Sequence, residues 1–386
     1  MTLWHRLCPA VLSVCLALLA SPGAALTAEE RQALDLGRYH ITDPAAGYFD
    51  REARRTYLAT TSDPILLAAL DHLAFGQSCT DVLAQPVMSG EVRLPGYYID
   101  NEAWREAVKP FAAFEDTVTG LAASEFVRAD GYAGNCLVDV LLRWARADAL
   151  TRFPTPDDDR QGWYQIESML FAAGLALMNV RDTLPDRTAD IAEIDRWLKR
   201  AADIHWSYPG QPNGTCCNNH FYRRALYRTV IGIQTGNDEM FRDGISAIYS
   251  ALDEATPEGA LPLEMKRGER AAHYQNFALM NLMMIAELAE RQGYKVHEIE
   301  VNGKTLQTLI DFDLAAIETP ETVAPFAGAR EQWRGYLAQG QYFGWLEPYL
   351  ARTGDPRAAA ILAPLRPVEN RSLGGPMTLY FYTPAP

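Results

Sequence analysis

Apolar side chains recur at helical spacing along most of this 386-residue chain. The positions Leu137, Leu141, Trp144 and Ala145 follow the i, i+4, i+7, i+8 pattern that places side chains on one face of a helix. The same kind of spacing predicts further helices over residues 163–180, 191–206, 219–234, 239–255, 270–292 and 329–352. Alternating patterns typical of strands are scarce, so the sequence predicts an all-α protein.

Glycine and proline mark most of the joints between these segments. Gly236 follows one predicted helix, and the stretch TPEGALPLE precedes another. No low-complexity linker divides the chain, and no internal repeat is strict enough to count. We therefore predict a single domain of antiparallel helix pairs joined by long loops.

The longest stretch without helical periodicity in the first half of the chain covers residues 87–104, VMSGEVRLPGYYIDNEAW. Long loops in compact domains are usually functional or mobile. Tyr97 and Tyr98 lie in this stretch, where they either cover a bound sugar or pack on the rim of a core. The pattern leaves both interpretations open.

The N-terminus has the pattern of a secretory signal peptide. Residues 1–25 contain Arg6, an apolar run over residues 11–20 and the small residues Gly23 and Ala25. No later stretch reaches the roughly 18 apolar residues that a membrane-spanning helix needs. We predict that residues 1–25 are removed, and that residues 26–386 form one exported domain, periplasmic or secreted, without membrane insertion.

The net charge limits the possible binding partners, and the cysteine count indicates possible disulfides. The chain has 35 basic and 49 acidic residues, a net charge of −14 that argues against nucleic acid as a partner. An acidic substrate would require the basic residues to be concentrated in one place. Four cysteines follow the signal peptide, which suggests two disulfides with three possible connectivities. The four are Cys79, Cys136, Cys216 and Cys217.

One candidate for chemistry is the stretch TCCNNHFYRRALYR, residues 215–228. Asn218 or Asn219 is a natural N-cap, which places His220 in the first turn of a helix, where free N–H groups attract anions. Helical spacing places four polar or basic side chains on one face, with Arg228 at its edge. These four are His220, Arg223, Arg224 and Tyr227. Taken alone, the segment is better explained by a capped helix with a solvated basic face.

A second candidate is LPLEMKRGERAAHYQNFALMNL, residues 261–282. Arg270 and Tyr274 are four positions apart, and Arg267 lies one turn earlier, so the three can point the same way. An arginine beside a phenol favours the phenolate and lowers its pKa, which would make Tyr274 a better base. The alternative is a cation stacked on a ring at the surface.

Motifs for other chemistries are missing from the sequence. The histidines show no ligand spacing such as HExxH, there is no CxxC pair, and no GxSxG elbow, phosphate loop or dinucleotide fingerprint occurs. We therefore expect neither a metal nor a cofactor. The acidic runs at residues 114–117 and 157–159 are most simply solvated surface, and they are the places where a glycosidase carboxylate pair would be sought.

The stretches CCNNHFY, RGERAAHYQNFAL, GWLEPYLAR and RSLGG resemble the alginate lyases of polysaccharide lyase family 5, the poly(β-D-mannuronate) lyases. The resemblance runs over most of the chain after the signal peptide and implies an incomplete α/α toroid with a deep cleft closed by a lid loop. Carried over by position, the catalytic set of that family falls on Asn219, His220, Arg267 and Tyr274. The resemblance also implies the disulfides Cys79–Cys136 and Cys216–Cys217. The chain departs from the family after NNH, where Arg223 and Arg224 follow, and in the lid, which offers tyrosines where some members have lysine.

The resemblance implies cleavage of a 1,4-linked uronate polymer by β-elimination, carried out by a monomer. In that chemistry Asn219 and Arg267 would neutralise the uronate carboxylate, while Tyr274 or His220 would move the proton. The residues expected to bind substrate are Tyr97, Tyr98, Arg223, Arg224, Lys266, Arg270 and Trp345. Two alternatives remain at this point: a lyase for another polyuronate such as polyglucuronate, or a non-catalytic periplasmic polysaccharide-binding protein.

Overall fold

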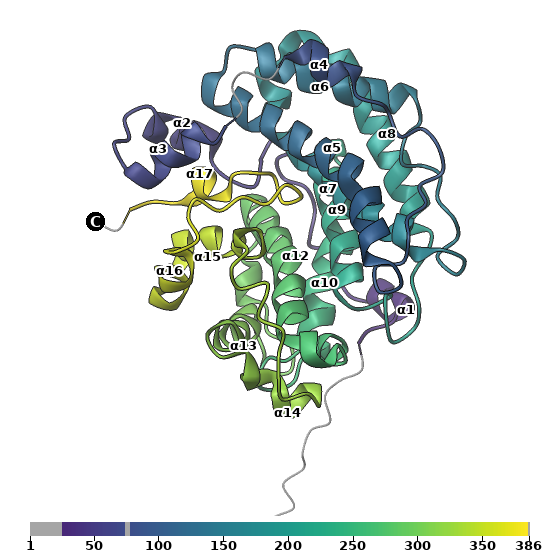
Figure 1. Ribbon diagram of the computed structural model, residues 1–386, viewed down its shortest axis with the longest axis vertical. Coiled ribbons are helices and arrows are strands. Elements are labelled where there is room, and N and C mark those ends of the chain that lie inside the picture. The colour runs from purple at the N-terminus through teal and green to yellow at the C-terminus, as the bar shows by residue number, and fades with distance from the viewer. Residues whose placement is uncertain (1–24, 74–77, 385–386) are drawn as a thin grey trace, which may run out of the picture.

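The computed structural model describes residues 25–73 and 78–384, and these residues fold almost entirely into helices (Figure 1). The α-helices are α1 (Ala28–Gln32), α2 (Arg51–Leu58), α3 (Pro64–Asp71), α4 (Cys79–Ala84), α5 (Asn101–Arg128), α6 (Tyr132–Arg146), α7 (Arg160–Val180), α8 (Thr188–Trp206), α9 (Asn219–Thr235), α10 (Asp238–Glu254), α11 (Pro262–Met265), α12 (Ala271–Arg291), α13 (Leu306–Glu318), α14 (Ala324–Ala327), α15 (Leu346–Thr353), α16 (Pro356–Leu362) and α17 (Met377–Phe381). Short 3₁₀ helices are η1 (Arg181–Thr183), η2 (Pro185–Arg187), η3 (Gly268–Arg270), η4 (Val296–Glu298), η5 (Pro320–Val323) and η6 (Gly340–Phe343). In this part of the chain the only β-pairing consists of two isolated bridges, Val301 with Lys304 and Asn370 with Gly375.

Four consecutive helix pairs form the body of the molecule. The pairs are α5 with α6, α7 with α8, α9 with α10, and α12 with α13, and the two members of each pair pack on each other. The first helices of the pairs, α5, α7, α9 and α12, also pack side by side as an inner layer, while the second helices lie outside (Figure 1). This arrangement is an incomplete α/α toroid, as expected from the sequence.

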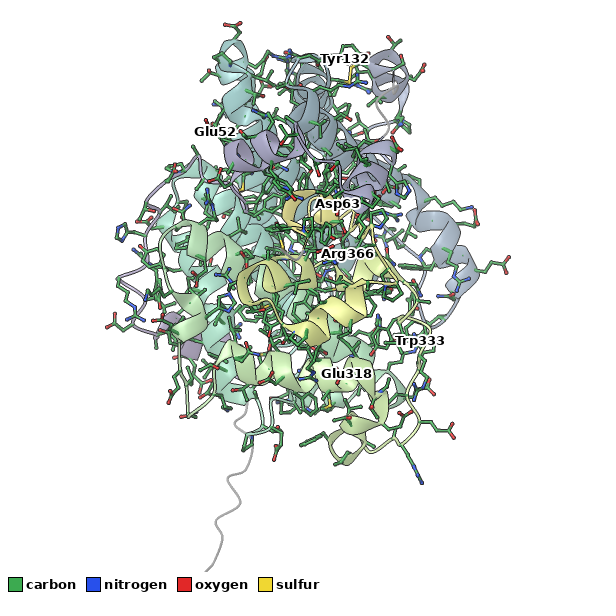
Figure 2. The ribbon with its side chains drawn as sticks, turned by 90° about the vertical axis from the view of Figure 1, so that its left-hand side faces the viewer. Glu52, Asp63, Tyr132, Glu318, Trp333 and Arg366 are labelled. Carbon is green, nitrogen blue, oxygen red and sulfur yellow. A yellow bond between two sulfur atoms is a disulfide. The ribbon has the colours of Figure 1, made fainter. Side chains whose placement is uncertain are left out.

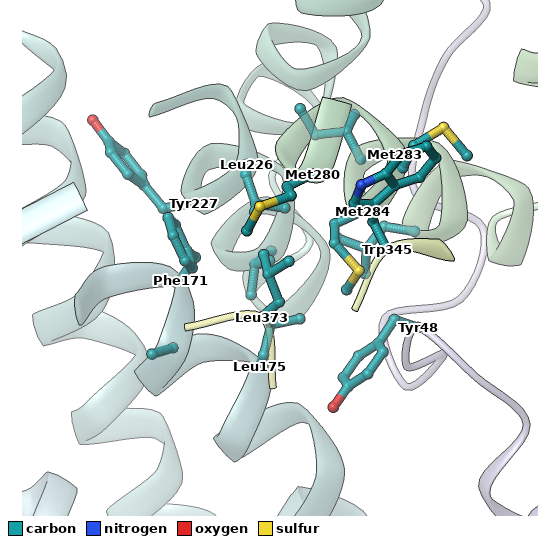
Figure 3. Packing of buried hydrophobic residues seen from close by; sticks show 14 of the residues in the cluster. Tyr48, Phe171, Leu175, Leu226, Tyr227, Met280, Met283, Met284, Trp345 and Leu373 are labelled. Carbon is teal, nitrogen blue, oxygen red and sulfur yellow. The ribbon is translucent and has the colours of Figure 1, made fainter. Parts of the chain in front are cut away.

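The inner helices α7 and α12 are buried on nearly all sides because apolar residues surround most of each helix, whereas α9 is equally buried but pairs Arg224 and Arg228 with carboxylates. Figure 3 shows this packing, with Phe171 and Leu175 from α7, Leu226 from α9 and Met280 from α12 in one cluster. The same cluster contains Trp345, which is fully buried. The toroid therefore has a continuous apolar core between its layers.

Most of the predicted helices are present, with two exceptions. Residues 329–352 were expected to form one helix, but turns and η6 occupy the first part and only α15 is α-helical. The prediction was wrong because the glycines at 335, 340 and 344 interrupt a stretch whose aromatic residues imitate helical spacing. The sequence analysis also missed α5, a 28-residue helix that carries Pro110 in its interior.

The chain termini lie against different parts of this body. The C-terminal helices α15 and α17 pack together, and α17 contacts α3, so the last segment is joined to the first helices of the chain. Figure 2 faces this side, with Asp63 and Arg366 labelled. The predicted signal peptide covers residues 1–25. Residues 1–24 lie outside the described residues, and only Ala25 is described. Among the described residues, no helix is both long and apolar enough to cross a membrane.

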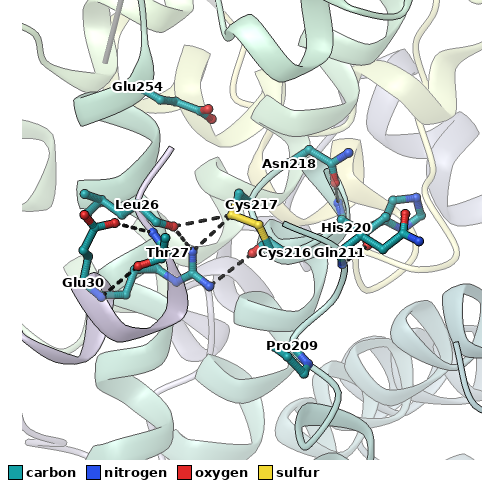
Figure 4. Close-up of a disulfide and its surroundings, with 12 residues drawn as sticks. Leu26, Thr27, Glu30, Pro209, Gln211, Cys216, Cys217, Asn218, His220 and Glu254 are labelled. Carbon is teal, nitrogen blue, oxygen red and sulfur yellow. Dashed lines mark hydrogen bonds between the residues drawn. A yellow bond between two sulfur atoms is a disulfide. The ribbon is translucent and has the colours of Figure 1, made fainter. Parts of the chain in front are cut away.

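Both disulfides implied by the resemblance are present. Cys79 at the start of α4 is bonded to Cys136 in α6, with the Cα atoms 5.6 Å apart. Cys216 is bonded to its neighbour Cys217, just before α9 (Figure 4). Arg31 of α1 supports this second bond, since its guanidinium donates to the carbonyl oxygen of Cys216 at 3.1 Å.

We predict that the two disulfides differ in their contribution to stability. The bond between Cys79 and Cys136 spans 57 positions and restricts the unfolded chain, so Cys79→Ala/Cys136→Ala should lower the free energy of unfolding by about 4 kcal/mol. Cys216→Ala/Cys217→Ala is the matched control, because a bond between neighbours restricts little chain. Denaturant midpoints measure both, and equal losses would contradict the prediction.

Candidate active site

The two sequence segments singled out above meet at one cavity of about 600 Å³. Its lining comes from the loop of residues 87–100, the first turns of α7, the segment that leads into α9, and the segment from α11 to α12. Asn219, His220, Arg267 and Tyr274 all line it. The structure therefore brings together the four residues on which the catalytic prediction rests.

The start of α9 is fixed by its cap. The side chain of Asn218 accepts a hydrogen bond from the backbone N–H of His220 at 3.0 Å, so Asn218 is the N-cap and His220 lies in the first turn. The helix then runs into the core and ends at Gly236, whose φ of 65° is the left-handed conformation that glycine adopts without strain. The cap thus places Asn219 and His220 where an inner helix opens into the cavity.

The imidazole of His220 is held from two sides. Its Nδ1 lies 3.1 Å from Oε2 of the buried Glu167, and its ring stacks on Tyr164 with the centroids 3.8 Å apart. A carboxylate can only accept, so Nδ1 carries the proton and Nε2 has a free lone pair. Burial lowers the pKa of His220, Glu167 opposes that shift, and the nearby Arg223 adds to it, so the imidazole is neutral at pH 7.

The carboxylate of Glu167 lies beneath the cavity and interacts with His220, Arg223 and Arg224. Burial alone would raise its pKa, but His220, Arg223 and Arg224 outweigh burial and the pKa is lowered. The guanidinium of Arg223 lies 3.2 Å from the carboxylate, and that of Arg224 lies 3.4 Å from it. Glu167 is therefore ionised beneath the cavity and fixes three cationic or polar side chains at once.

Tyr274 lies on the first turn of α12 and lines the same cavity as His220. The guanidinium carbon of Arg267 is 4.3 Å from the centroid of its ring. Its hydroxyl oxygen lies 2.7 Å from that of Tyr98, which belongs to the loop over the cavity. Tyr98 is therefore in direct contact with the predicted catalytic phenol.

The expected pKa of Tyr274 requires correction. Burial and the hydrogen bond to Tyr98 both raise the pKa of this phenol, and Arg267 lowers it by less than they raise it. The sequence analysis considered the arginine alone and predicted a lowered pKa. With Tyr98 in contact, Tyr274 is instead held in its protonated form.

The loop that carries Tyr97 and Tyr98 is attached to the start of α7. The backbone N–H of Val92 donates to the carbonyl oxygen of Arg152 at 2.9 Å. Gly162 in the first turn of α7 lies so close to the loop that a Cβ there would be 2.0 Å from the carbonyl oxygen of Val92. Only glycine permits this approach, which positions the two tyrosines at the cavity.

The residues predicted to bind substrate divide into two groups. Tyr97, Tyr98, Arg223 and Lys266 line the cavity. Arg270 does not, since its guanidinium packs 4.9 Å from the ring centroid of Trp333 and 6.0 Å from that of Tyr98.

Two further predictions of substrate contact were wrong. Arg224 is 1% exposed and donates to the carbonyl oxygens of Thr215 and Pro209, because one step along α9 turns it away from the side of Arg223. Trp345 is fully buried, and its indole N–H donates to Asn276 at 2.8 Å. Both residues stabilise the fold and do not face the cavity.

Other polar residues from the sequence analysis are structural too. Arg228 pairs with Asp203 at 2.6 Å and with Asp243 at 2.7 Å, away from the cavity. Glu115, read as solvated surface, is 3% exposed and accepts from Ser168 at 2.7 Å and from Ser372 at 3.0 Å. A buried charged residue of this kind can be noticed in the sequence, because Glu115 lies among the apolar residues of the buried helix α5.

Sequence analysis missed several residues of the site. Glu167 and Glu264 are fully buried carboxylates beneath it, and Tyr164, Arg160 and Gln211 belong to its lining. Glu167 had a detectable signal, because it is the single charged residue in the apolar run over residues 166–180. Glu264 was inside the second segment but was passed over in favour of the cations around it.

Glu264 connects the two segments of the site. Its Oε1 accepts from the backbone N–H of Asn219 at 2.6 Å, and its Oε2 accepts from the Asn219 side-chain nitrogen at 2.9 Å. Its own backbone carbonyl accepts from the N–H of Arg267 at 3.0 Å. Burial raises the pKa of Glu264 to about 7, against the lowering effects of Arg267 and Asn219.

An amide, an imidazole, a guanidinium and a phenol thus line one cavity of an α/α toroid. Comparison with known proteins is more specific. The family model described as alginate lyase matches residues 38–323, so the chain belongs to the alginate lyase family, of the polysaccharide lyase family 5 type that the resemblance indicated.

Individual relatives agree with this assignment. A polysaccharide lyase of Stenotrophomonas maltophilia is 27% identical over 82% of this chain and 96% of that protein. An alginate lyase of Pseudomonas syringae pv. syringae is 29% identical over 72% of this chain and 74% of that protein. The family model itself, over residues 38–323, includes both segments that carry the site.

Solved structures give the same answer for the fold. Alginate lyase A1-III, in a histidine-to-alanine variant complexed with tetrasaccharide, aligns with a TM-score of 0.85 and 30% identity over 92% of this chain and 100% of that one. Alginate lyase A1-III from Sphingomonas species A1 aligns with a TM-score of 0.82 and 30% identity over 91% and 99% of the two chains. The incomplete toroid is thus shared with this family.

The different environments of the adjacent arginines lead to a prediction. Arg224→Met should lower stability by about 3 kcal/mol, because it removes one partner of a buried charge pair, with little change in KM for alginate. Arg223→Met also removes a partner of buried Glu167 and should lower stability too, but it should in addition raise KM roughly tenfold, because a charge-assisted contact of about 1.5 kcal/mol would be lost from the cavity.

Thermal unfolding and steady-state kinetics on both variants measure the two effects, and each variant is the control for the other. A large rise in KM for Arg224→Met, with unchanged stability, would contradict the burial described here.

Proposed function

We propose that this protein is a lyase that cleaves 1,4-linked polyuronate chains by β-elimination and leaves 4,5-unsaturated uronate ends, with mannuronate-rich alginate as its substrate. The observation that supports this most is the convergence of Asn219, His220, Arg267 and Tyr274 on one cavity from two distant segments. The A1-III structures complexed with tetrasaccharide add support, since they share this fold at 30% identity.

The main chemical demand of this reaction is charge neutralisation. The C5 proton of a uronate is only weakly acidic while the neighbouring carboxylate keeps its charge. In the proposal Arg267 and the amide of Asn219 hold that carboxylate and stabilise the enediolate-like charge of the transition state. Loss of one such contact typically costs about 3 kcal/mol, or roughly 100-fold in rate.

The proton transfers fall to Tyr274 and His220. In mannuronate the C5 proton and the departing O4 lie on the same side of the ring, so one phenol, Tyr274, can take the proton and return it to O4. Entry of the substrate would replace Tyr98 as the neighbour of this phenol, so Arg267 would favour the phenolate against burial alone, and the phenolic proton would leave to solvent before Tyr274 takes the C5 proton. His220, neutral and with a free Nε2, would serve as the base for guluronate, where the geometry is opposite.

The charge of the lining suits an acidic polymer. Arg160, Arg223, Lys266 and Arg267 line the cavity of a chain whose net charge is −14. Low-dielectric walls focus the field of such a cluster, so it attracts a polyanion that the outer surface repels. We further propose that the enzyme acts as a monomer without a cofactor, in the periplasm or outside the cell, after removal of residues 1–25.

The substrate can be tested with three polymers. Incubation with polymannuronate should produce ultraviolet absorbance from unsaturated uronate ends faster than incubation with polyguluronate or polyglucuronate. Polyglucuronate is included because Arg223 stands in the lining where the sequence departs from its family. Binding without new absorbance on any polymer would contradict a lyase, and cleavage without absorbance would indicate a hydrolase.

Tyr274→Phe tests the role of the phenol. The variant keeps the ring against Arg267 but has no hydroxyl to move a proton, so kcat on polymannuronate should fall at least roughly 1000-fold, while the Kd for the polymer stays within a few-fold of the wild-type value. Absorbance assays and calorimetric binding measure the two quantities. Turnover close to wild type would remove tyrosine from the mechanism.

A further inference from the structure

The side chain of Asn219 has an unusual hydrogen-bonding state. It is fully buried, its nitrogen is directed to Glu264, and its Oδ1 has no hydrogen-bond partner among the described residues. A buried carbonyl oxygen without a donor is costly. In a site that has to hold a substrate carboxylate, the amide oxygen is also the wrong atom to leave unpaired. A carboxylate accepts hydrogen bonds, so it needs the N–H groups of the amide and not its oxygen.

Glu264 is responsible for this orientation. An ionised carboxylate only accepts, so the amide has to turn its N–H to it, which occupies a donor that the substrate could use. A protonated Glu264 reverses the preference. Its O–H would donate to Asn219 Oδ1 after a half-turn of the amide, with the oxygen and nitrogen exchanging places, and both N–H bonds would be free for the substrate.

The setting of Glu264 favours proton uptake. It is fully buried, and among the described residues its carboxylate oxygens receive hydrogen bonds from Asn219 alone. Several titratable groups surround it. These are Arg267 after α11, Tyr222 from α9, Glu254 from α10 and Tyr274 from α12, while α14 contributes none. Arg267 lowers its pKa, burial raises it, and a second carboxylate brought to Asn219 would raise it further.

We propose that Glu264 is a positioning residue that sets which end of the Asn219 amide meets the substrate, and that it takes up one proton from solvent when the uronate carboxylate binds. The proton forms an O–H bond on Oε2, and that O–H donates to Asn219 Oδ1 in place of the N–H···Oε2 bond. The amide N–H groups then donate to the substrate carboxylate. Release of the product returns the proton to solvent. This inference deepens the proposed function and rests on it.

Calorimetry in buffers of different ionisation enthalpy counts the protons taken up on binding. The experiment uses Tyr274→Phe as an inactive background and a mannuronate tetrasaccharide as the probe. Because the pKa of free Glu264 is about 7, uptake should be near zero at pH 6 and approach one proton at pH 8.5. The Kd should weaken by roughly tenfold per pH unit above pH 7.

Glu264→Gln in the same background imitates the protonated state, because its amide can donate to Asn219 Oδ1 and still accept from the Asn219 backbone. It should bind as tightly at pH 8.5 as at pH 6, with no proton uptake. The matched control is Glu254→Gln. Glu254 is also a buried glutamate, with its pKa raised by burial to about 8, but among the described residues it accepts from Tyr222 at 2.5 Å, while the Asn219 nitrogens donate to Glu264. That control should keep both the uptake and the pH dependence.

The outcomes separate this inference from the proposed function. If wild-type protein produces unsaturated ends but the tetrasaccharide binds the Tyr274→Phe background without proton uptake at pH 8.5, the inference is wrong and the function stands. Uptake that disappears in Glu254→Gln would also overturn it. If no polyuronate is cleaved, the function fails and the inference fails with it. If Glu264→Gln does not fold, the proton uptake measured on tetrasaccharide binding to Tyr274→Phe, with and without Glu254→Gln, decides whether the inference holds.

Discussion

The architecture of the site depends on one buried carboxylate that joins two distant pieces of chain. Glu264 accepts from both nitrogens of Asn219 at the start of α9, and its backbone carries the turn that presents Arg267. A carboxylate removed from water needs such donors, so the requirement to satisfy it holds the segments in register. The positions of the amide and the guanidinium are thereby coupled through a residue that touches no substrate.

A second buried carboxylate organises the neighbouring side of the site. Glu167 orients His220 and fixes Arg223, while Arg224 completes its charge balance from the core side. This pairing explains how an acidic chain presents a cationic surface at one place: the negative charge of Glu167 faces inward, is paired, and holds Arg223 in position at the cavity.

The sequence allowed the fold class and the four central residues of the site to be predicted. Three of the four inner helices, α7, α9 and α12, have an apolar spacing strong enough to identify, and NNH with the later Arg and Tyr matches a specific family pattern. The errors have physical causes. Arg223 and Arg224 are neighbours on one helix, and which of them faces the cavity depends on how α9 is rotated against α7, which spacing alone does not give. Trp345 follows a glycine-interrupted aromatic stretch whose burial is decided by tertiary packing. The pKa of Tyr274 depends on its burial in the folded protein and on Tyr98, which is 176 positions away.

The contact between the hydroxyl groups of Tyr98 and Tyr274 has a consequence for timing. Tyr98 is 64% exposed, on a loop that covers the cavity, and its partner is the phenol proposed to move the proton. A polymer cannot reach that phenol without separating the pair. The same movement that admits the chain therefore also removes one of the contacts that raise the pKa of Tyr274, although burial, the larger cause, remains.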